Sequence, residues 1–412
     1  LAAYVSGAGC GRYTLYGAHD HRMLERIMIV AGESSGELYG ALLAKAIRSR
    51  NPGVRIAGVG GERMESAGVE LISAIASSFG LIEAIKTFGK IKKTFKKIVA
   101  ALTSFAPQVV VLIDYPDFNI PVAREAKRRG IKVLYYVSPQ VWAWRIRRVE
   151  AIGQLVDAMA VVLPFEADLY RSTGIPCEFV GHPVMDEIAV AGGNSDAIKA
   201  ELGLHPDLPV MVLMPGSRPH EVQKLLPVMA EAAAAMKERF PGYQFVLPVA
   251  PNLSTEALSV MSNELKEFDL QSLVITDQAV KALLSADVAL IASGTATLQA
   301  ALLGVPMVVL YKLSPFTYFV GKLVVKVRHV SLVNILLDKS VRDDSGLRIR
   351  ELLQGAANKK NIMDELARLS DNQEYKNTMI SQMGKVKAFF LNRNASLRVA
   401  EMVEQTASGV KR

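Results

Sequence analysis

One stretch decides the fold: Asp287-Val-Ala-Leu-Ile-Ala-Ser-Gly-Thr-Ala-Thr-Leu-Gln-Ala-Ala-Leu-Leu-Gly-Val-Pro306, followed by Met307-Val-Val-Leu-Tyr311. An apolar run, a small-residue turn, an Ala- and Leu-rich run that ends at Gly304 and a second apolar run predict strand, loop, helix and strand. The turn, Ser293-Gly294-Thr295, offers hydroxyls and backbone N–H groups at a helix N-terminus, where an anion is favoured. Ser and Thr are also ordinary helix caps, so this turn alone leaves a phosphate site and a plain βα turn both open.

A second glycine turn strengthens the phosphate interpretation. It ends the apolar run Met211-Val-Leu-Met-Pro-Gly-Ser-Arg218 and adds an arginine. A guanidinium can bind a phosphate through two parallel hydrogen bonds. Two such turns in one half of the chain, Gly216-Ser217-Arg218 and Ser293-Gly294-Thr295, therefore predict a site for a nucleotide diphosphate.

Length and composition limit the class of protein. A chain of 412 residues usually forms more than one core, so two α/β domains are expected. A net charge of +8 suits nucleic acid, anionic lipid or a phosphorylated substrate. The two cysteines, Cys10 and Cys177, exclude a disulfide framework and fit a reducing cytoplasm. Residues 288–311 carry no charge, but Ser293-Gly294-Thr295 and Gly304-Val-Pro306 break the run, so a membrane-spanning helix is rejected.

The remaining pattern predicts two arrays of alternating strands and helices. In the first array, apolar strands are expected at 27–31, 54–59, 109–113, 133–137 and 158–163. The second array starts at residue 209 and includes strands at 245–249, 273–276, 288–292 and 307–311. We therefore predict a disordered extension at 1–25, a Rossmann-like domain at 26–190, a second at 191–380 and a C-terminal helix at 381–412 that can pack back on the first domain. Ligands bind at the carboxyl ends of such strands, where loops 32–37, 114–119 and 138–145 fall.

A series of short motifs becomes recognisable within these arrays. They are Ala31-Gly-Glu-Ser-Ser-Gly-Glu37, Ile113-Asp-Tyr-Pro-Asp-Phe-Asn119, Tyr136-Val-Ser-Pro-Gln-Val-Trp-Ala-Trp-Arg145, Leu163-Pro-Phe-Glu166, Val180-Gly-His-Pro183, Met214-Pro-Gly-Ser-Arg218, Ala292-Ser-Gly-Thr-Ala296 and Ser314-Pro-Phe-Thr317. In this order, over about residues 27 to 400, they closely resemble the lipid-A-disaccharide synthases. The resemblance implies the glycosyltransferase B fold, an α/β architecture in which two Rossmann-like domains face a cleft.

The resemblance also implies a reaction and its partners. The expected activity transfers 2,3-diacylglucosamine from UDP to the 6-hydroxyl of 2,3-diacylglucosamine 1-phosphate, with inversion, on the route to lipid A. The implied binding residues of the UDP donor are Gly216, Ser217, Arg218, Ser293, Gly294, Thr295, Gln299 and Asn334, and those of the acceptor and its loops are Ser34, Ser35, Glu37, Ser138, Gln140, Trp142, Trp144 and Arg145. The alternative is an epimerase of UDP-N-acetylglucosamine with the same fold.

An inverting transfer needs a general base and a group that neutralises the departing diphosphate. We expect Asp117 to be the base and Asp114 to orient or cap the loop, although either carboxylate could simply accept from its own turn. Glu37 and His182 are weaker candidates for the base. No Asp-x-Asp pair is present, and no His cluster lies outside the N-terminal extension, so we expect neither a metal nor another cofactor.

The tryptophan loop allows two interpretations. Trp142 and Trp144 either pack locally, which is common for large rings, or form a wall for a sugar. In the second interpretation Arg145, Arg147 and Arg148 lie near the phosphate of the acceptor.

Two features depart from the family pattern. Gln299 stands where a glutamate is expected to accept hydrogen bonds from the ribose, so the amide predicts weaker ribose binding that Gln299→Glu would restore. The segment after Asn334, residues 335–350, is longer and more charged than expected. Functions that the family assigns to that segment therefore need not carry over to this chain.

A basic amphipathic helix is expected between Ile85 and Leu102. The predicted membrane contacts are Phe88, Ile91, Lys92, Lys93, Phe95, Lys96 and Lys97. The alternative is an apolar stripe that packs on the sheet. We favour peripheral contact with the cytoplasmic face of the inner membrane, expect no nucleic-acid partner, and consider that segment 314–337 faces lipid or a second subunit of a homodimer.

Overall fold

The structure, a computed structural model, describes residues 24–74, 81–144, 146–249, 273–314, 327–341 and 346–409, with isolated positions between 253 and 270. The side chains of Ser34, of residues 81–88 and of Trp144 are not among those described. Most of the predicted extension, residues 1–25, and half of segment 314–337, residues 315–326, therefore lie outside the described part of the chain.

The N-terminal domain is built on a seven-stranded parallel sheet of order β3-β2-β1-β4-β5-β6-β7. Its strands are β1 Arg26–Ala31, β2 Arg55–Gly60, β3 Glu70–Ala74, β4 Val109–Ile113, β5 Lys132–Tyr136, β6 Ala158–Val161 and β7 Cys177–Phe179. Its helices are α1 Ser34–Arg50, α2 Glu62–Ser66, α3 Leu81–Ser104, α4 Pro116–Arg128, α5 Val141–Trp144, α6 Arg148–Gly153, α7 Glu166–Tyr170, the 3-10 turn η1 Arg171–Thr173 and α8 Val184–Ala191.

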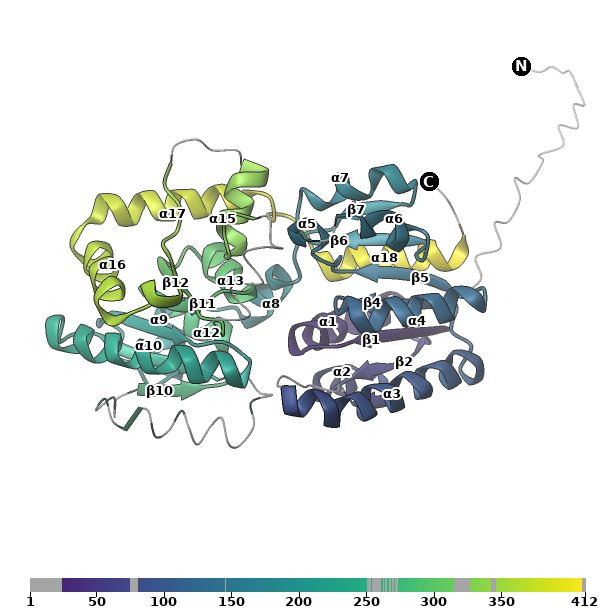
Figure 1. The fold of residues 1–412 in the computed structure, drawn as a ribbon, viewed down its shortest axis with the longest axis horizontal. Helices are drawn as coiled ribbons and strands as arrows, with labels where there is room; N and C mark the ends of the chain where they lie inside the picture. Colours follow the sequence, from purple (N-terminus) through teal and green to yellow (C-terminus); the bar gives the residue numbers. More distant parts are fainter. Residues whose placement is uncertain are drawn as a thin grey trace, which may run out of the picture.

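Helices cover both faces of this sheet (Figure 1). Alternate side chains of β1 enter different apolar cores: Ile27 and Ile29 join one, and Met28 and Val30 join the other. Strands buried on both faces need continuous apolar runs, as in Val109–Ile113, where all five residues are buried. This double burial is why the strands of both domains could be located from short apolar runs.

The C-terminal domain repeats the plan with a six-stranded sheet of order β10-β9-β8-β11-β12-β13, also parallel. Its strands are β8 Val210–Met214, β9 Gln244–Pro248, β10 Leu273–Thr276, β11 Val288–Ala292, β12 Met307–Tyr311 and β13 Glu351–Leu353. Its helices are α9 Ser195–Glu201, α10 Pro219–Arg239, α12 Ala279–Leu284, α13 Thr295–Leu303, α15 Leu332–Leu336, the π-helical turn η2 Leu337–Val341, the 3-10 turn η3 Gln354–Ala356, α16 Lys359–Asp371 and α17 Gln373–Ala388.

The last helix, α18 Ala395–Ser408, returns to the N-terminal domain, where it packs against α1 and β5 (Figure 1). Arg50 of α1 pairs with Glu404 at 2.8 Å, and the backbone N–H of Ser396 donates to Asp186 at 2.8 Å. The boundary drawn at residue 380 falls inside α17, which stays on the C-terminal domain until Ala388. The crossing between domains therefore lies after α17.

Both sheets reverse their strand order at one pair of neighbouring strands, β1 and β4 in the first and β8 and β11 in the second. Loops that follow such a pair diverge and leave a crevice at the carboxyl edge of the sheet. The recognised motifs Gly32–Glu37, Asp114–Asn119, Pro215–Arg218 and Ser293–Thr295 follow these four strands directly. In the described part of the chain, every helix is too short or too polar to cross a membrane.

Candidate functional site

A cleft of about 670 Å³ lies between the two domains. Its walls are the loops after β1, β8 and β11, the helix α8, and the beginnings of α1, α12 and α13. Because each of the four loops at the reversal points belongs to the carboxyl edge of its sheet, the two crevices open towards each other. Most of the predicted donor residues line this cleft: Gly216, Ser217, Arg218, Ser293, Gly294, Thr295 and Gln299.

Arg218 is the main cation at the end of β8. Its Nη2 is 3.2 Å from Glu33 Oε2 of the N-terminal domain, and its Nη1 is 3.2 Å from Glu221 Oε1 of α10. Gly216 bends the chain here with a φ of 113°, and a Cβ at this position would touch the Glu221 side chain. The turn therefore needs glycine, and it directs the guanidinium across the cleft.

The turn after β11 presents the N-terminus of α13 to the cleft. The hydroxyl of Ser293 donates to the carbonyl oxygen of Val330 at 2.7 Å, which anchors the turn to the segment before α15. Thr295 is hydrogen-bonded to the hydroxyl of Tyr39, which comes from α1. Unpaired backbone N–H groups at the first turn of a helix attract an anion. The geometry fits a phosphate group between Arg218 and Thr295.

Gln299 also lines the cleft, but its amide is already paired. Its Nε2 donates to Glu187 Oε2 of α8 at 2.8 Å. Burial raises the pKa of Glu187, while the bond from Gln299 partly offsets this effect. Gln299, which replaces the expected glutamate, thus donates a hydrogen bond to a carboxylate on α8.

Asp114 stands at the end of β4 in a strained backbone. Asp114 and Tyr115 have φ values of 48° and 44°, a left-handed conformation that is costly for residues other than glycine. The carbonyl of Asp114 accepts from Asn119 Nδ2 at 2.7 Å and from the Tyr135 hydroxyl at 2.6 Å, and these bonds hold the bend. Burial, followed by the charge of Glu33, raises the pKa of Asp114 to about 6, although Arg218 opposes the shift.

The position of Asp117 does not favour its assignment as the base, which stays a prediction. Its side chain is 83% exposed, and Arg148 Nη1 is 4.0 Å from its Oδ1. Neither Asp117 nor Asp114 is among the residues that line the cleft. Asp117 lies in the first turn of α4, on the outer side of the left-handed bend. Of the two carboxylates, Asp114 is the one coupled electrostatically to Glu33, Arg218 and Tyr39 of the cleft.

The weaker candidates for the base have structural positions. Glu37 lines the cleft, but its Oε1 accepts the backbone N–H of Arg63 at 3.0 Å and so caps α2. Burial lowers the pKa of His182 to about 3, and its Nδ1 accepts the N–H of Val184 at 3.2 Å. His182 is therefore a buried structural group, whereas Glu37 combines its capping contact with a place in the cleft. Ser35 lines the cleft beside Glu37.

The tryptophan loop follows the packing interpretation in its described part. Trp142 is only 8% exposed, and its Nε1 donates to Glu166 Oε1 at 3.0 Å. Ser138 is buried in the same cluster, whereas Gln140 is exposed. Three of the predicted acceptor groups, the Ser34 and Trp144 side chains and the whole of Arg145, lie outside the described residues. A sugar wall made by the Trp142 ring is therefore wrong, because the ring is covered by protein.

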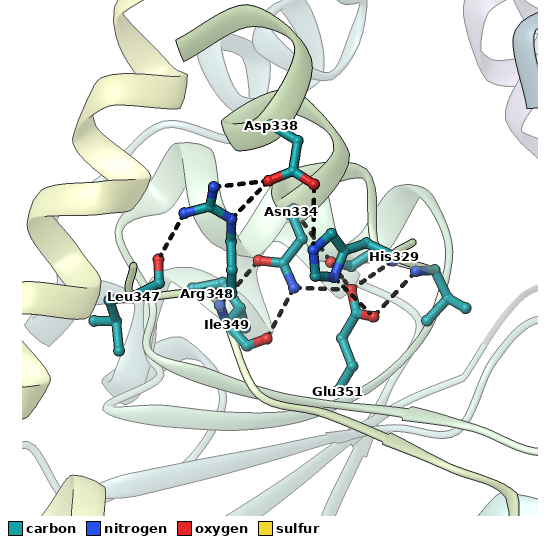
Figure 2. Close-up of polar contacts among 9 residues, drawn as sticks. His329, Asn334, Asp338, Leu347, Arg348, Ile349 and Glu351 are labelled. Carbon is teal, nitrogen blue, oxygen red and sulfur yellow. Dashed lines mark hydrogen bonds and ion pairs between the residues drawn. The ribbon is translucent and has the colours of Figure 1, made fainter. Parts of the chain in front are cut away.

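Asn334 is misplaced in the predicted donor set. It is completely buried, and its Nδ2 donates to the carbonyl of Ile349 and to Glu351 Oε1, both at 2.8 Å. Its Oδ1 accepts the N–H of Ile349 at 2.9 Å. Figure 2 shows these bonds at the centre of a polar network. With both ends of its amide in use, Asn334 fastens α15 to the strand β13 and does not reach a donor.

The predicted membrane helix also buries its apolar residues within the protein. On α3, Ile91 and Phe95 pack against the apolar core, and Phe95 meets Phe118 edge to face at 6.4 Å. Lys92, Lys93, Lys96 and Lys97 are exposed. The Phe88 side chain lies outside the described residues. The apolar stripe of α3 is thus core, and what faces outward is its row of lysines.

Several cleft residues were absent from the predicted site. Glu33 and Tyr39 come from the loop and helix after β1, Glu187 comes from α8, and the stretch Asp277–Lys281 follows β10. Glu33 belongs to a recognised motif at a reversal point of the sheet, so its position could have been inferred. Tyr39 and Glu187 meet the cleft only because the two domains face each other. Among the described residues, no group of three or more His, Cys, Asp or Glu side chains could hold a metal ion.

The family model described as lipid-A-disaccharide synthetase matches residues 27–404. The lipid-A-disaccharide synthase of Geobacter sulfurreducens is 41% identical over 380 residues, which covers 92% of this chain and 96% of the relative. That of Syntrophus aciditrophicus is 42% identical over 343 residues, covering 82% and 87%.

Solved structures with a similar fold are far less similar in sequence. The Staphylococcus aureus MnaA structure with UDP has a TM-score of 0.62 at 12% identity, covering 94% of this chain and 98% of its own. The UDP-GlcNAc 2-epimerase of Neisseria meningitidis, bound to UDP-GlcNAc, has a TM-score of 0.60 at 13% identity, covering 92% and 99%. The calicheamicin glycosyltransferase CalG4 has a TM-score of 0.59 at 15% identity, covering 94% and 99%. At these identities the likeness establishes the fold alone.

Proposed function

Because the chain belongs to the lipid-A-disaccharide synthetase family, we propose that its cleft holds the UDP donor on the C-terminal domain and presents the acceptor to Asp114 on the N-terminal domain. The enzyme is a glycosyltransferase. It transfers 2,3-diacylglucosamine from UDP to 2,3-diacylglucosamine 1-phosphate and forms the β-1,6-linked disaccharide 1-phosphate and UDP.

The observation that carries the proposal is that Arg218 of the C-terminal domain lines the cleft and pairs with Glu33 of the N-terminal domain, whose charge acts on the buried Asp114. Arg218 is 3.2 Å from Glu33, and the charge of Glu33 is one cause of the raised pKa of Asp114. An inverting transfer needs a cation beside the leaving diphosphate and a base on the opposite face of the sugar. The proposal assigns the first task to Arg218 and the second to Asp114.

In the proposed step, the Asp114 carboxylate takes the proton of the acceptor 6-hydroxyl. The oxygen then bonds to C1 of the donor sugar while the bond from C1 to the diphosphate oxygen breaks, and UDP leaves with the electron pair. Arg218 and the N–H groups at the start of α13 stabilise the charge that develops on the diphosphate. The proposal includes no metal, since this cation and these donors supply the compensation.

The raised pKa of Asp114 suits this task. A carboxylate with a pKa of about 6 is a stronger base than an ordinary one, yet it is mostly deprotonated at neutral pH. The left-handed bend at Asp114 and Tyr115 adds a second sign of function, because strain of this kind gathers at active sites.

Both substrates carry acyl chains, so the enzyme must meet a lipid surface. We propose that the exposed Lys92, Lys93, Lys96 and Lys97 of α3 make that contact with the anionic inner membrane from the cytoplasmic side. The support is the row of exposed lysines on a helix whose described apolar residues Ile91, Phe95, Ile98 and Leu102 pack in the core. The attraction is then electrostatic and does not require insertion of α3.

One incubation tests the function. The purified protein is mixed with UDP-diacylglucosamine and diacylglucosamine 1-phosphate, and the products are followed by mass spectrometry. We expect the disaccharide 1-phosphate and one UDP for each disaccharide. A second incubation with UDP-N-acetylglucosamine alone distinguishes the epimerase that shares the fold, because epimerised sugar nucleotide without a disaccharide would contradict the proposal.

A further inference from the structure

Lys339 of the C-terminal domain lies over two aromatic rings of the N-terminal domain. Its Nζ is 5.6 Å from the centroid of the Trp142 ring and 5.2 Å from that of Phe165. Both distances fall within the range of a cation–π interaction. Figure 1 shows α5, which carries Trp142, on the side of its domain that faces α15. This contact therefore bridges the domains away from the residues that line the cleft.

The two rings are held in place from within their own domain. They meet edge to face at 5.2 Å. Trp142 Nε1 donates to Glu166 Oε1 at 3.0 Å, and Glu166 Oε2 accepts the N–H of Leu163 at 3.1 Å. Burial raises the pKa of Glu166 to about 7, with both bonds opposing the rise. The rings form a fixed platform at the domain boundary.

The turn that carries Lys339 is held from the other side, while the Lys339 side chain itself is exposed. Lys339 lies in the π-helical turn η2, next to Asp338. Asp338 accepts from Arg348 Nε at 2.8 Å and lies 3.3 Å from His329 Nε2, while His329 Nδ1 lies 3.5 Å from Glu351 Oε2 (Figure 2). A π-helical turn is uncommon and often marks a functional site. The charged segment 335–350, which departs from the family pattern, thus supplies Lys339 and part of its support.

The same network reaches the donor turn. Glu351 Oε2 accepts the N–H of Val330 at 3.1 Å, and the carbonyl of Val330 accepts the hydroxyl of Ser293 at 2.7 Å. Ser293 begins the turn that we assign to the diphosphate. One continuous set of hydrogen bonds and ion pairs therefore links the donor turn to Asp338, the residue next to the lysine that touches the other domain.

Three contacts cross the cleft itself: Arg218 with Glu33, Thr295 with Tyr39 and Gln299 with Glu187. The first two cannot keep the domains aligned while a diphosphate is bound. A diphosphate that binds Arg218 and Thr295 must replace their present partners. Lys339, Trp142 and Phe165 do not line the cleft, so their contact can persist when the donor is in place.

We propose that Lys339 is a positioning residue for transfer, which keeps the donor turn aligned with the N-terminal domain while UDP-diacylglucosamine occupies the cleft. This inference rests on the proposed function, because alignment matters only if donor and acceptor are held by different domains. Lys339 touches neither substrate in this account. Its effect should appear in kcat and not in the affinity for UDP.

The test compares Lys339→Met, which keeps the length of the side chain, with Lys339→Arg, which keeps its charge. The control is Lys360→Met, at an exposed lysine of the same domain. A cation–π contact of ordinary strength predicts that Lys339→Met lowers kcat by about three- to tenfold. The Arg variant and the control should stay within about twofold of wild type. UDP affinity and the melting temperature should be unchanged in all three. An unchanged kcat in Lys339→Met, or parallel losses of UDP affinity and melting temperature, would overturn the inference.

A second readout does not depend on activity. The chain has only two tryptophans, Trp142 and Trp144, and a nearby ammonium group quenches indole emission. We expect Lys339→Met to emit more strongly than wild type, by the same factor with and without saturating UDP. Equal emission would mean that the contact does not form in solution, and a difference that vanishes with UDP would mean that it does not persist. A wild-type protein that makes no disaccharide would instead contradict the proposed function, so the two failures are distinguishable.

Discussion

The positive charge of Arg218 acts on two carboxylates, Glu33 and Asp114. Arg218 pairs with Glu33, whose charge raises the pKa of Asp114. In the proposed function a diphosphate displaces Glu33 from Arg218, which leaves the Glu33 charge to act on Asp114 without its partner. The proposal therefore predicts that donor binding and the basicity of Asp114 are coupled through Glu33.

Glu33→Gln tests this coupling in two ways. Removing a competing carboxylate should tighten UDP binding by about two- to fivefold, the range expected for a partly exposed ion pair. The charge of Glu33 raises the pKa of Asp114, so its loss should lower that pKa. The protonated base is inactive, so kcat/KM of wild type should fall as pH drops through about 6, and this limb should move to lower pH in the variant.

Calorimetric titration with UDP and a pH profile of kcat/KM provide the two measurements. Glu62→Gln is a suitable control, since Glu62 is exposed and does not line the cleft. An acidic limb that stays in place in Glu33→Gln would show that Glu33 does not act on the base.

Gln299 gives a second test at this scale. The sequence alone suggests that Gln299→Glu tightens UDP binding. In the structure the new carboxylate would face Glu187, whose oxygen is 2.8 Å from the present amide nitrogen. Two carboxylates at that distance repel, so the single variant should bind UDP no more tightly than wild type.

The double variant Gln299→Glu with Glu187→Gln exchanges the two partners and should recover at least the wild-type affinity. Calorimetry on the three proteins decides the matter. Tighter binding by Gln299→Glu alone would mean that residue 299 turns to the ribose and releases Glu187.

Among the elements, α3 carries the most direct prediction. Changing Lys92, Lys93, Lys96 and Lys97 to Glu should release the enzyme from anionic vesicles, since each lysine near the surface contributes about 1 kcal/mol. Phe95→Ser should instead lower the melting temperature, because Phe95 packs against the core. Vesicle sedimentation and thermal unfolding measure the two effects.

A matched control changes Lys359 and Lys360 of α16 to Glu, since both lysines are exposed there. Equal vesicle binding by wild type and the α3 variant, at low and at high salt, would remove α3 from the membrane contact.

The elements also show what a sequence can and cannot reveal. Short, unbroken apolar runs predicted the central strands, and β4 has the predicted bounds, 109–113. The short edge strands β3, β7 and β13 were missed, because three to five residues with a Glu in each give no clear apolar period. The glycine turns after β8 and β11 were located correctly, since their residues and the adjacent strands are local in sequence.

Predictions failed where the answer depends on contacts between distant segments. Asp114 and Asp117 are nearly equivalent in sequence. Only the left-handed bend, which Asn119 and Tyr135 hold in place, directs Asp114 inward and leaves Asp117 outside. Asn334 was predicted to bind the donor, but in the structure its amide is hydrogen-bonded to Ile349 and to Glu351 of β13. Neither the bend nor the pairing leaves a signal in a short motif.

At the scale of the whole molecule, the site forms because the carboxyl edges of the two sheets face each other. Each domain alone presents an ordinary crevice at the reversal point of its sheet. Joined, they bring Arg218 of one domain to Glu33 of the other across the cleft, and α18 returns to pack on the N-terminal domain. Of the two candidate carboxylates, Asp114 is the one on which the charges of Glu33 and Arg218 act.

The most direct test of this account is the turnover of Asp114→Asn and Asp117→Asn, measured side by side with saturating UDP-diacylglucosamine and diacylglucosamine 1-phosphate. Loss of a general base should lower kcat of Asp114→Asn by roughly 10²–10⁴-fold while UDP affinity stays near that of wild type. Asp117→Asn, an exposed substitution outside the cleft, should stay within about twofold of wild type. A large loss in Asp117→Asn beside a nearly normal Asp114→Asn would contradict the account.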